Sequence, residues 1–164
     1  MNDALPLHVL FLSARNACRS IMAEALLNKV GQGRFRAMSA GKKAASQIHP
    51  FAAETLKQVG YDTSEQYPKA WGVFVTPTAP RIDAVVTMDD SLEDIELPIW
   101  YSNPVRVHWG FADPEQVQGD EMERIGAYRR CFGNMEQQML KLAGQATDGV
   151  RGQALSQILE SITP

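Results

Sequence analysis

A short apolar segment near the start of the chain leads into a polar loop and then into a helical pattern. Residues 8–12 (His-Val-Leu-Phe-Leu) predict a buried strand, because a continuous apolar run is typical of the centre of a parallel sheet. Residues 13–20 (Ser-Ala-Arg-Asn-Ala-Cys-Arg-Ser) form the loop, and residues 21–27 carry apolar side chains at helical spacing up to a helix-ending Gly31. This order of strand, loop and helix predicts an α/β architecture.

The rest of the chain continues the alternation of strand and helix patterns. Further strands are expected at residues 35–40, 82–88 and 105–108, and further helices begin near Pro50, Ile125 and Val150. No repeat, low-complexity tract or linker divides the sequence. We therefore predict one domain over residues 1–164, an α/β fold whose parallel sheet is doubly wound.

Composition excludes several classes of protein. A hydrophobic content of 45% with 21% charged residues is typical of a folded domain, and a net charge of −3 favours neither nucleic acid nor an anionic membrane as a partner. No apolar run approaches the roughly 20 residues of a membrane-spanning helix. Residues 1–12 contain Asp3 and no Lys or Arg, which argues against a secretory signal. Only two cysteines occur, so a cytoplasmic protein without disulfides is expected.

The loop at residues 13–20 is a candidate anion site. Ligands of open α/β sheets collect at the carboxyl ends of the strands, and a loop entering a helix offers unpaired backbone N–H groups beside the positive end of the helix dipole. Arg19 adds a fork of donors suited to phosphate, arsenate or sulfate. The alternative is an ordinary capped helix, with Ser20 or Asn16 as the cap and Arg19 in solvent.

The segment from residue 9 to residue 28 resembles the low-molecular-weight tyrosine phosphatases and the arsenate reductases related to them, many of them bacterial. The resemblance continues along nearly the whole chain, at residues 33–37, 39–41, 50–52, 60–64, 69–71, 79–83, 108–110 and 113–114. It implies three layers around a four-stranded parallel sheet of flavodoxin-like strand order, followed by a C-terminal helix.

The resemblance also implies roles for particular residues. Arg19 would hold the oxyanion, Ser20 would hydrogen-bond the nucleophile, Asn16 would brace the loop, and Asp113 would protonate the leaving oxygen. The residues implied to bind the oxyanion are Ala14, Arg15, Asn16, Ala17, Cys18, Arg19 and Ser20. No metal and no cofactor is implied, and a thiol donor would be needed only by an active reductase.

Two positions depart from the family pattern. The nucleophilic cysteine is replaced by Ser13, and an alcohol is a poor nucleophile without an adjacent base. Reductases of this fold also carry cysteines after the third strand and before a nearby proline, whereas this chain has Asp89 and Leu97 there. With Ser13, Arg19 and Asp113 as the catalytic set, we predict an oxyanion-binding homologue with little or no turnover.

Alternative interpretations remain open at this point. The natural chain could carry cysteine at position 13, with Ser13 introduced to trap a substrate, or Cys18 could replace the lost nucleophile rather than serve as a small buried side chain. A third alternative is a non-catalytic interaction module that docks a partner through residues 66–78. The expected partners are a small oxyanion or a phosphorylated substrate, with no nucleic acid and no membrane, and the expected state is a monomer or weak dimer.

Overall fold

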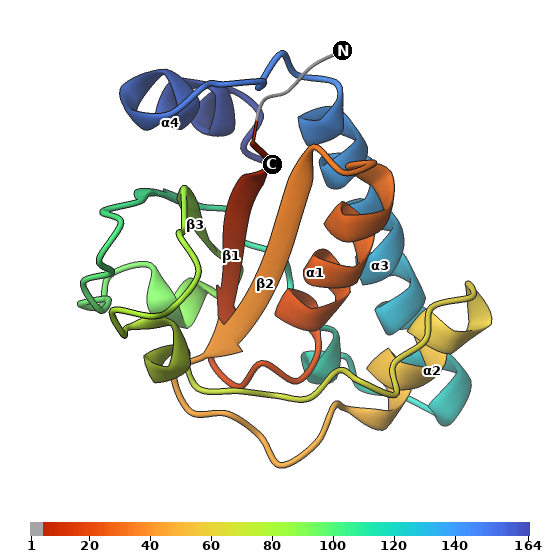
Figure 1. Cartoon of the computed structure of the whole chain (residues 1–164). Coiled ribbons are helices and arrows are strands. Elements are labelled where there is room, and N and C mark those ends of the chain that lie inside the picture. The colour runs from red at the N-terminus through yellow and green to blue at the C-terminus, as the bar shows by residue number, and fades with distance from the viewer. Residues whose placement is uncertain (1–4) are drawn as a thin grey trace.

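The protein forms a four-stranded parallel sheet with the strand order β2-β1-β3-β4 (Figure 1). The computed structural model describes residues 5–164, so Asp3, used above to argue against a leader, lies outside the described residues. The strands are β1 (Leu7–Ser13), β2 (Phe35–Gly41), β3 (Ala84–Thr87) and β4 (Val105–His108). The predicted fold class is confirmed by this sheet and its helices.

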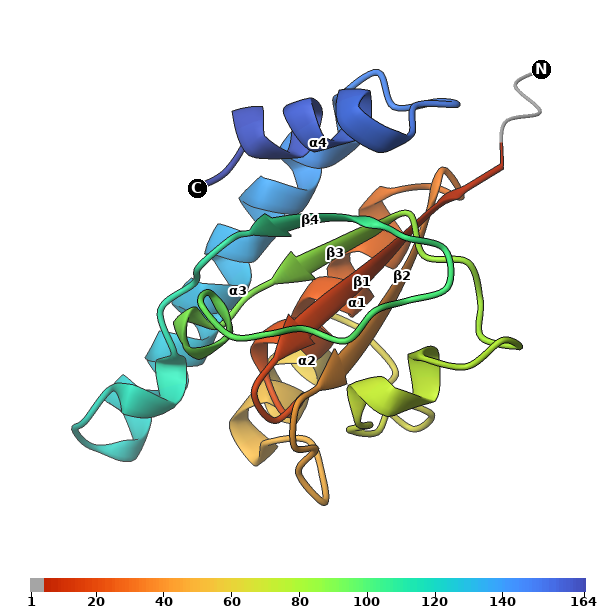
Figure 2. The same cartoon turned by 90° about the vertical axis from the view of Figure 1, so that its left-hand side faces the viewer.

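Three helices cover one face of the sheet, and a fourth packs against β4 (Figures 1 and 2). They are α1 (Arg19–Val30), α2 (Pro50–Gln58), α3 (Glu121–Ala143) and α4 (Gly152–Ser161). The apolar seam of α3 faces the core as its spacing predicts, with Phe132, Met135 and Met139 buried. The Trp109 indole donates to the carbonyl of Leu159 at 3.2 Å and so ties α4 to the end of β4.

The opposite face carries loops and short 3₁₀ helices. A second apolar cluster lies here, around Leu10, Leu12 and Trp100. It is covered from the segments around η1 (Trp71–Phe74) and η2 (Asp90–Leu92). A third 3₁₀ helix, η3 (Pro114–Gln116), follows β4 at the edge where the strands end. Because both faces are covered, β1 is buried along nearly its whole length, which explains its unbroken apolar sequence.

Local chemistry sets several element boundaries. Gly31 ends α1, where a Cβ would lie 2.6 Å from the carbonyl oxygen of Leu27. Helix α3 begins before the apolar pattern does, because Asp120 caps it by accepting the N–H of Glu123 at 2.8 Å. Strand β3 is shorter than the predicted 82–88 segment, although Asp83 and Met88 still donate to carbonyls of β1.

Among the helices of residues 5–164, none combines the length and apolar character that crossing a bilayer requires.

Candidate oxyanion-binding site

The loop of residues 14–18 joins the carboxyl end of β1 to the first turn of α1. Cys18 is the N-cap residue of α1, and no side chain of the described residues caps this helix. The first N–H groups of a helix have no intrahelical partner, so this end of α1 presents donors and the positive end of its dipole to the loop. The alternative of a helix capped by Ser20 or Asn16 is therefore wrong.

The carbonyl groups of the loop are held on one side by the segment that follows β2. The backbone N–H groups of residues 42, 43, 45 and 49 donate to the carbonyls of Ser13, Ala14, Arg15 and Ala17 at 2.8–3.2 Å. A trans peptide points its C=O and N–H in opposite directions, and no cis peptide occurs in the described chain. Fixing these carbonyls therefore turns the N–H groups of the next residues toward the opposite side, away from residues 42–49.

Several donors of this loop have no acceptor. Among residues 5–164, the backbone N–H groups of Arg15, Ala17 and Cys18 bond to no protein oxygen. Close packing against β2 holds the loop in this shape, because a Cβ on Gly41 would lie 2.8 Å from atoms of Arg15 and Asn16. The loop is thus a set of backbone donors aimed at a space that the rest of the protein leaves open.

Asn16 is buried and fixes the turn of the loop from inside. Its φ of 52° lies in the left-handed region that asparagine tolerates better than most residues. The Asn16 carboxamide donates to Ser20 Oγ at 2.8 Å and accepts the backbone N–H of Lys69 at 2.9 Å. The loop is therefore tied both to α1 and to the segment before η1.

Ser13 lies at the bottom of the loop within a network of hydrogen bonds. Its Oγ is 2.7 Å from Ser20 Oγ and accepts the backbone N–H of Asn16 at 3.0 Å. Among the residues that the structure describes, no histidine or carboxylate hydrogen-bonds this hydroxyl. Ser13, which the resemblance places at the nucleophile position, therefore has no general base among residues 5–164.

The guanidinium of Arg19 is held at the same place by carbonyls and carboxylates. One terminal nitrogen donates to the carbonyl of Phe111 at 2.9 Å, and the other lies 3.0 Å from Asp89 Oδ2 and 3.6 Å from Asp113 Oδ2. The Nε–H has no acceptor among residues 5–164. With its side chain only 10% exposed, Arg19 is not in solvent, and its free Nε–H is available to a bound anion.

These groups line a cavity of about 400 Å³. At its rim, Arg15 pairs with Glu115 at 3.8 Å, and Asp113 caps η3 by accepting the N–H of Glu115 at 3.0 Å. The lining residues are Ser13, Ala14, Arg15, Ala17, Cys18, Arg19, Asp89, Asp113, Glu115 and Gln116. We call this cavity the oxyanion pocket.

The pKa values of Asp89 and of the two cysteines are shifted in opposite directions. Burial opposes ionisation of Asp89, but hydrogen bonds from Ser91 and the charge of Arg19 outweigh it, so the pKa of Asp89 lies below its usual value. Burial raises the pKa of Cys18 well above its ordinary value and raises that of Cys131 to about 11. Both thiols are therefore protonated near neutral pH.

Comparison with known proteins assigns the family. Residues 8–153 match the family described as low molecular weight phosphotyrosine protein phosphatase. The chain belongs to that family. An arsenate reductase of Halalkalibacterium halodurans is 35% identical over 122 residues, which are 74% of this chain and 84% of that protein.

Solved structures of the family share the fold. The crystal structure of an arsenate reductase from Archaeoglobus fulgidus superposes with a TM-score of 0.67 at 26% identity, covering 84% of this chain and 99% of that one. An arsenate reductase in its phosphate-binding state gives a TM-score of 0.63 at 24% identity, with 84% and 96% covered. The predicted family resemblance is thus confirmed.

The structure brings the predicted family-site residues together. Residues 13–20 and Asp113 all lie at the oxyanion pocket or, for Asn16 and Ser20, directly behind it. Sequence reasoning missed Asp89, Glu115 and Gln116 as pocket residues. Asp89 was recognised only as a missing cysteine, although its place directly after a parallel strand puts it at the edge where such sites form.

Proposed function

We propose that this protein binds a tetrahedral oxyanion, either free phosphate, arsenate or sulfate or the phosphate group of a substrate, with little or no turnover. One observation carries the proposal: the backbone N–H groups of Arg15, Ala17 and Cys18 and the Nε–H of Arg19 meet at one pocket and have no acceptor among the residues that the structure describes. Backbone N–H groups at a helix N-terminus, together with arginine, are a recurrent arrangement for binding phosphate.

The nucleophile limits the chemistry. In the family pattern a cysteine stands at the position of Ser13, and a helix N-terminus with an arginine lowers a thiol pKa below neutrality. The same surroundings leave a hydroxyl protonated, and within residues 5–164 the Ser13 hydroxyl bonds only to Ser20 Oγ and to the N–H of Asn16. We infer that anion binding persists in this protein while covalent attack on phosphorus or arsenic is lost.

The thiols present give no route to arsenate reduction. The position after β3, where related reductases carry a cysteine, holds Asp89, whose carboxylate pairs with Arg19. Cys18 lines the pocket, but its neutral thiol is a weak nucleophile. Asp113 remains beside Arg19 at 3.6 Å, in the place of the general acid that the family pattern assigns to it.

Calorimetric titration with inorganic phosphate tests the binding step. The wild-type protein should bind phosphate, and Arg19→Gln should weaken binding at least about tenfold because a charged donor to the anion is removed. Arg15→Gln is the matched control, since it removes the same charge from a side chain that is 61% exposed at the rim. Absence of binding, or equal losses in the two variants, would contradict the proposal.

Restoring sulfur tests the catalytic step. Ser13→Cys should bind phosphate as the wild type does and should hydrolyse an aryl phosphate, whereas the wild type should not. Measurable hydrolysis by the wild type would contradict the loss of covalent chemistry. Turnover by the variant with none by the wild type would locate the loss at this one atom.

The proposal also includes the cellular compartment and the assembly state of the protein. We place it in the cytoplasm as a monomer or weak dimer that needs no cofactor for binding the oxyanion. Cys18 and Cys131 are free thiols, which agrees with a reducing compartment. Size-exclusion chromatography with light scattering measures the assembly state.

A further inference from the structure

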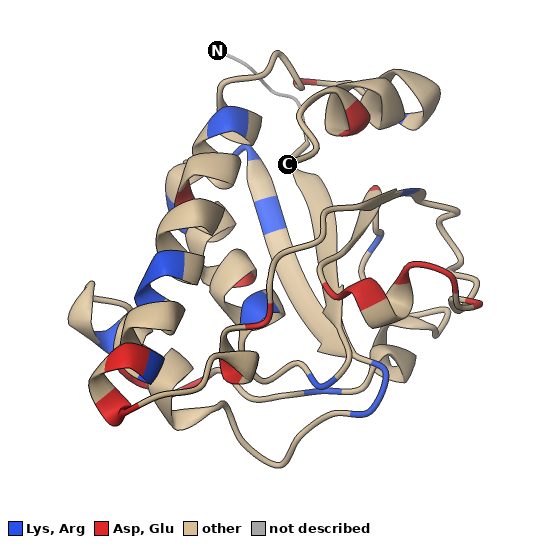
Figure 3. Cartoon of the chain, turned by 180° about the vertical axis from the view of Figure 1, so that it is seen from behind, with Lys and Arg blue, Asp and Glu red and all other residues tan. Residues whose placement is uncertain are grey.

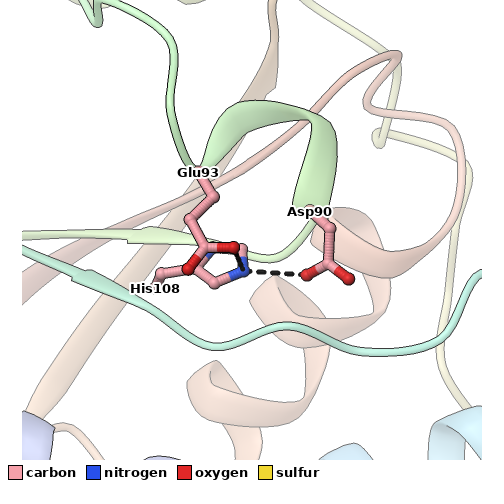
Figure 4. Close-up of side chains that lie close together, drawn as sticks. All are labelled: Asp90, Glu93 and His108. Atoms are coloured by element: carbon pink, nitrogen blue, oxygen red, sulfur yellow. Dashed lines mark hydrogen bonds and ion pairs between the residues drawn. The ribbon is translucent and has the colours of Figure 1, made fainter.

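A cluster of three potential metal ligands lies outside the oxyanion pocket. Asp90 and Glu93 extend from η2 and the residue following it, and His108 ends β4. Figure 4 shows both carboxylates reaching toward the Nε2 nitrogen of the imidazole. Asp90 Oδ1 lies 2.9 Å from Nε2 and Glu93 Oε2 lies 3.7 Å from it. The three ligand atoms all lie within 4.8 Å of one another.

We infer that Asp90, Glu93 and His108 form a binding site for one divalent transition-metal ion. Two carboxylate oxygens and one imidazole nitrogen suit Zn²⁺, Mn²⁺, Fe²⁺ or Co²⁺, whereas Mg²⁺ and Ca²⁺ prefer oxygen ligands alone. Ligand bonds to Zn²⁺ of about 2.0–2.2 Å place neighbouring ligand atoms roughly 3.3 Å apart. The distances from Nε2 to the two carboxylate oxygens lie near this value. The side chains of Asp90 and Glu93 are exposed, so they can shift by the few tenths of an ångström that metal binding requires.

The imidazole is oriented from behind. His108 Nδ1 lies 2.6 Å from the hydroxyl of Thr87, and Thr87 is itself buried in β3. A hydroxyl both donates and accepts, so Thr87 can accept a hydrogen bond from Nδ1–H, which leaves the Nε2 lone pair free for a metal ion bound between the imidazole and the carboxylates. A partner of this kind on the second ring nitrogen is the usual companion of a metal-binding histidine.

The backbone beside the cluster leaves room for it. A Cβ on Gly110 would lie 2.4 Å from Asp90 Oδ1 and 3.1 Å from His108 Nε2, so a side chain at this position would collide with the ligand atoms. The surrounding charge also favours a cation, because acidic residues gather along η2 and the loop after it (Figure 3). Those acidic residues are Asp89, Asp90, Glu93, Asp94 and Glu96.

A metal ion here would fasten η2 to the end of β4. Both segments continue into partners of Arg19: Asp89 directly precedes η2, and Phe111, whose carbonyl accepts from Arg19, follows His108 by three residues. The ion would therefore stiffen one wall of the oxyanion pocket without entering it, since none of its three ligands lines that pocket. Metal binding does not depend on the proposed function.

Titration of the metal-free protein with ZnCl₂ and CoCl₂ alone tests the inference. Calorimetry should give one ion per chain, and Co²⁺ should develop visible absorption bands that change in His108→Gln. Glu93→Gln should weaken binding at least about tenfold, and Thr87→Val should weaken it about tenfold by freeing the imidazole. Asp94→Asn is the matched control, because it removes one charge from the same exposed run but belongs to no ligand set.

A stability measurement supplies a second readout. Saturating Zn²⁺ should raise the unfolding temperature of the wild type and of Asp94→Asn, but not that of Glu93→Gln. Equal affinities in Glu93→Gln and Asp94→Asn, several ions per chain, or no binding at roughly 1 mM metal would show that the cluster is only an ion pair between histidine and carboxylates. Phosphate binding measured without metal remains a separate test of the oxyanion pocket.

Discussion

The carboxylate of Asp89 lies 3.0 Å from the guanidinium of Arg19, and the same oxygen accepts the backbone N–H of Ala14 at 3.3 Å. One carboxylate oxygen thereby connects the end of β3 with the loop after β1 and with the first residue of α1. This oxygen restrains the arginine, while the Nε–H of the arginine has no acceptor in the described part of the chain.

Asp89→Asn should lower stability and flatten its dependence on acid. The pKa of Asp89 is depressed in the folded protein, so the charged carboxylate stabilises the fold above the unfolded value of about 4 and loses this contribution as the pH falls through the lower folded value. Removing the charge should cost roughly 2 kcal/mol at neutral pH. Urea unfolding between pH 7 and pH 3 measures both effects.

Asp94→Asn provides the comparison for that experiment, because Asp94 is exposed on the same acidic segment. Its stability should follow that of the wild type across the pH range. If the two variants lost stability alike, the ion pair with Arg19 would not be the source of the effect.

Asn16→Ala should destabilise the protein through lost hydrogen bonds as well as backbone strain. Asn16 and Asn103 have φ values of 52° and 49°. Of the two, only Asn16 is buried, and its carboxamide both donates a hydrogen bond to Ser20 and accepts one from Lys69. Asn103→Ala therefore isolates the cost of the left-handed conformation. The free energy of unfolding should fall about 2 kcal/mol further for Asn16→Ala than for Asn103→Ala, and equal losses would remove the bracing role.

Gly41→Ala should deform the oxyanion pocket. The new methyl group would meet backbone atoms of Arg15 and Asn16 at 2.8 Å, which cannot yield as a flexible side chain would. We expect a loss of roughly 1–3 kcal/mol of stability and at least tenfold weaker phosphate binding. Gly133→Ala on α3, where a Cβ meets nothing within 4 Å, should be neutral or stabilising and should leave phosphate binding unchanged.

Both native cysteines should react slowly with a thiol reagent in the folded protein. At pH 8 the pKa of about 11 for Cys131 implies a thiolate fraction roughly one hundredth of that of an ordinary cysteine, and Cys18 is shifted in the same direction. Alkylation followed by mass spectrometry measures the rates. Ser13→Cys should add one fast-reacting site, and rapid labelling of Cys18 in the wild type would reopen its role as a nucleophile.

The strands and helices were predictable because buried strands and core-facing helices leave periodic apolar patterns, whereas the strand order was implied by the family resemblance. The ends of α3 and β3 were harder to predict. Helix α3 begins with a polar turn capped by Asp120, and β3 is shorter than its apolar segment because the flanking residues make only single hydrogen bonds to β1. Such boundaries depend on one or two polar contacts that hydrophobic periodicity does not record.

The candidate site was also predictable only in part. The loop at residues 13–20 was visible in sequence because its residues are contiguous, whereas the partners of Arg19 come from 69 to 94 residues away. Asp89 and the carbonyl of Phe111 reach Arg19 only through the parallel arrangement of β1, β3 and β4. The cluster of Asp90, Glu93 and His108 likewise needs two strand ends side by side, so its separate residues carried no signal.

The main-chain bonds from residues 42–49 to the loop after β1 have a consequence for the chemistry of the pocket. Because backbone hydrogen bonds hold the loop at residues 14–18 in its shape, we expect an exchange of the side chain at position 13 to leave that shape unchanged. Under the proposed function, covalent reactivity and anion binding are therefore separable in this scaffold: changing one atom at position 13 would remove the first and leave the backbone donors for the anion in place.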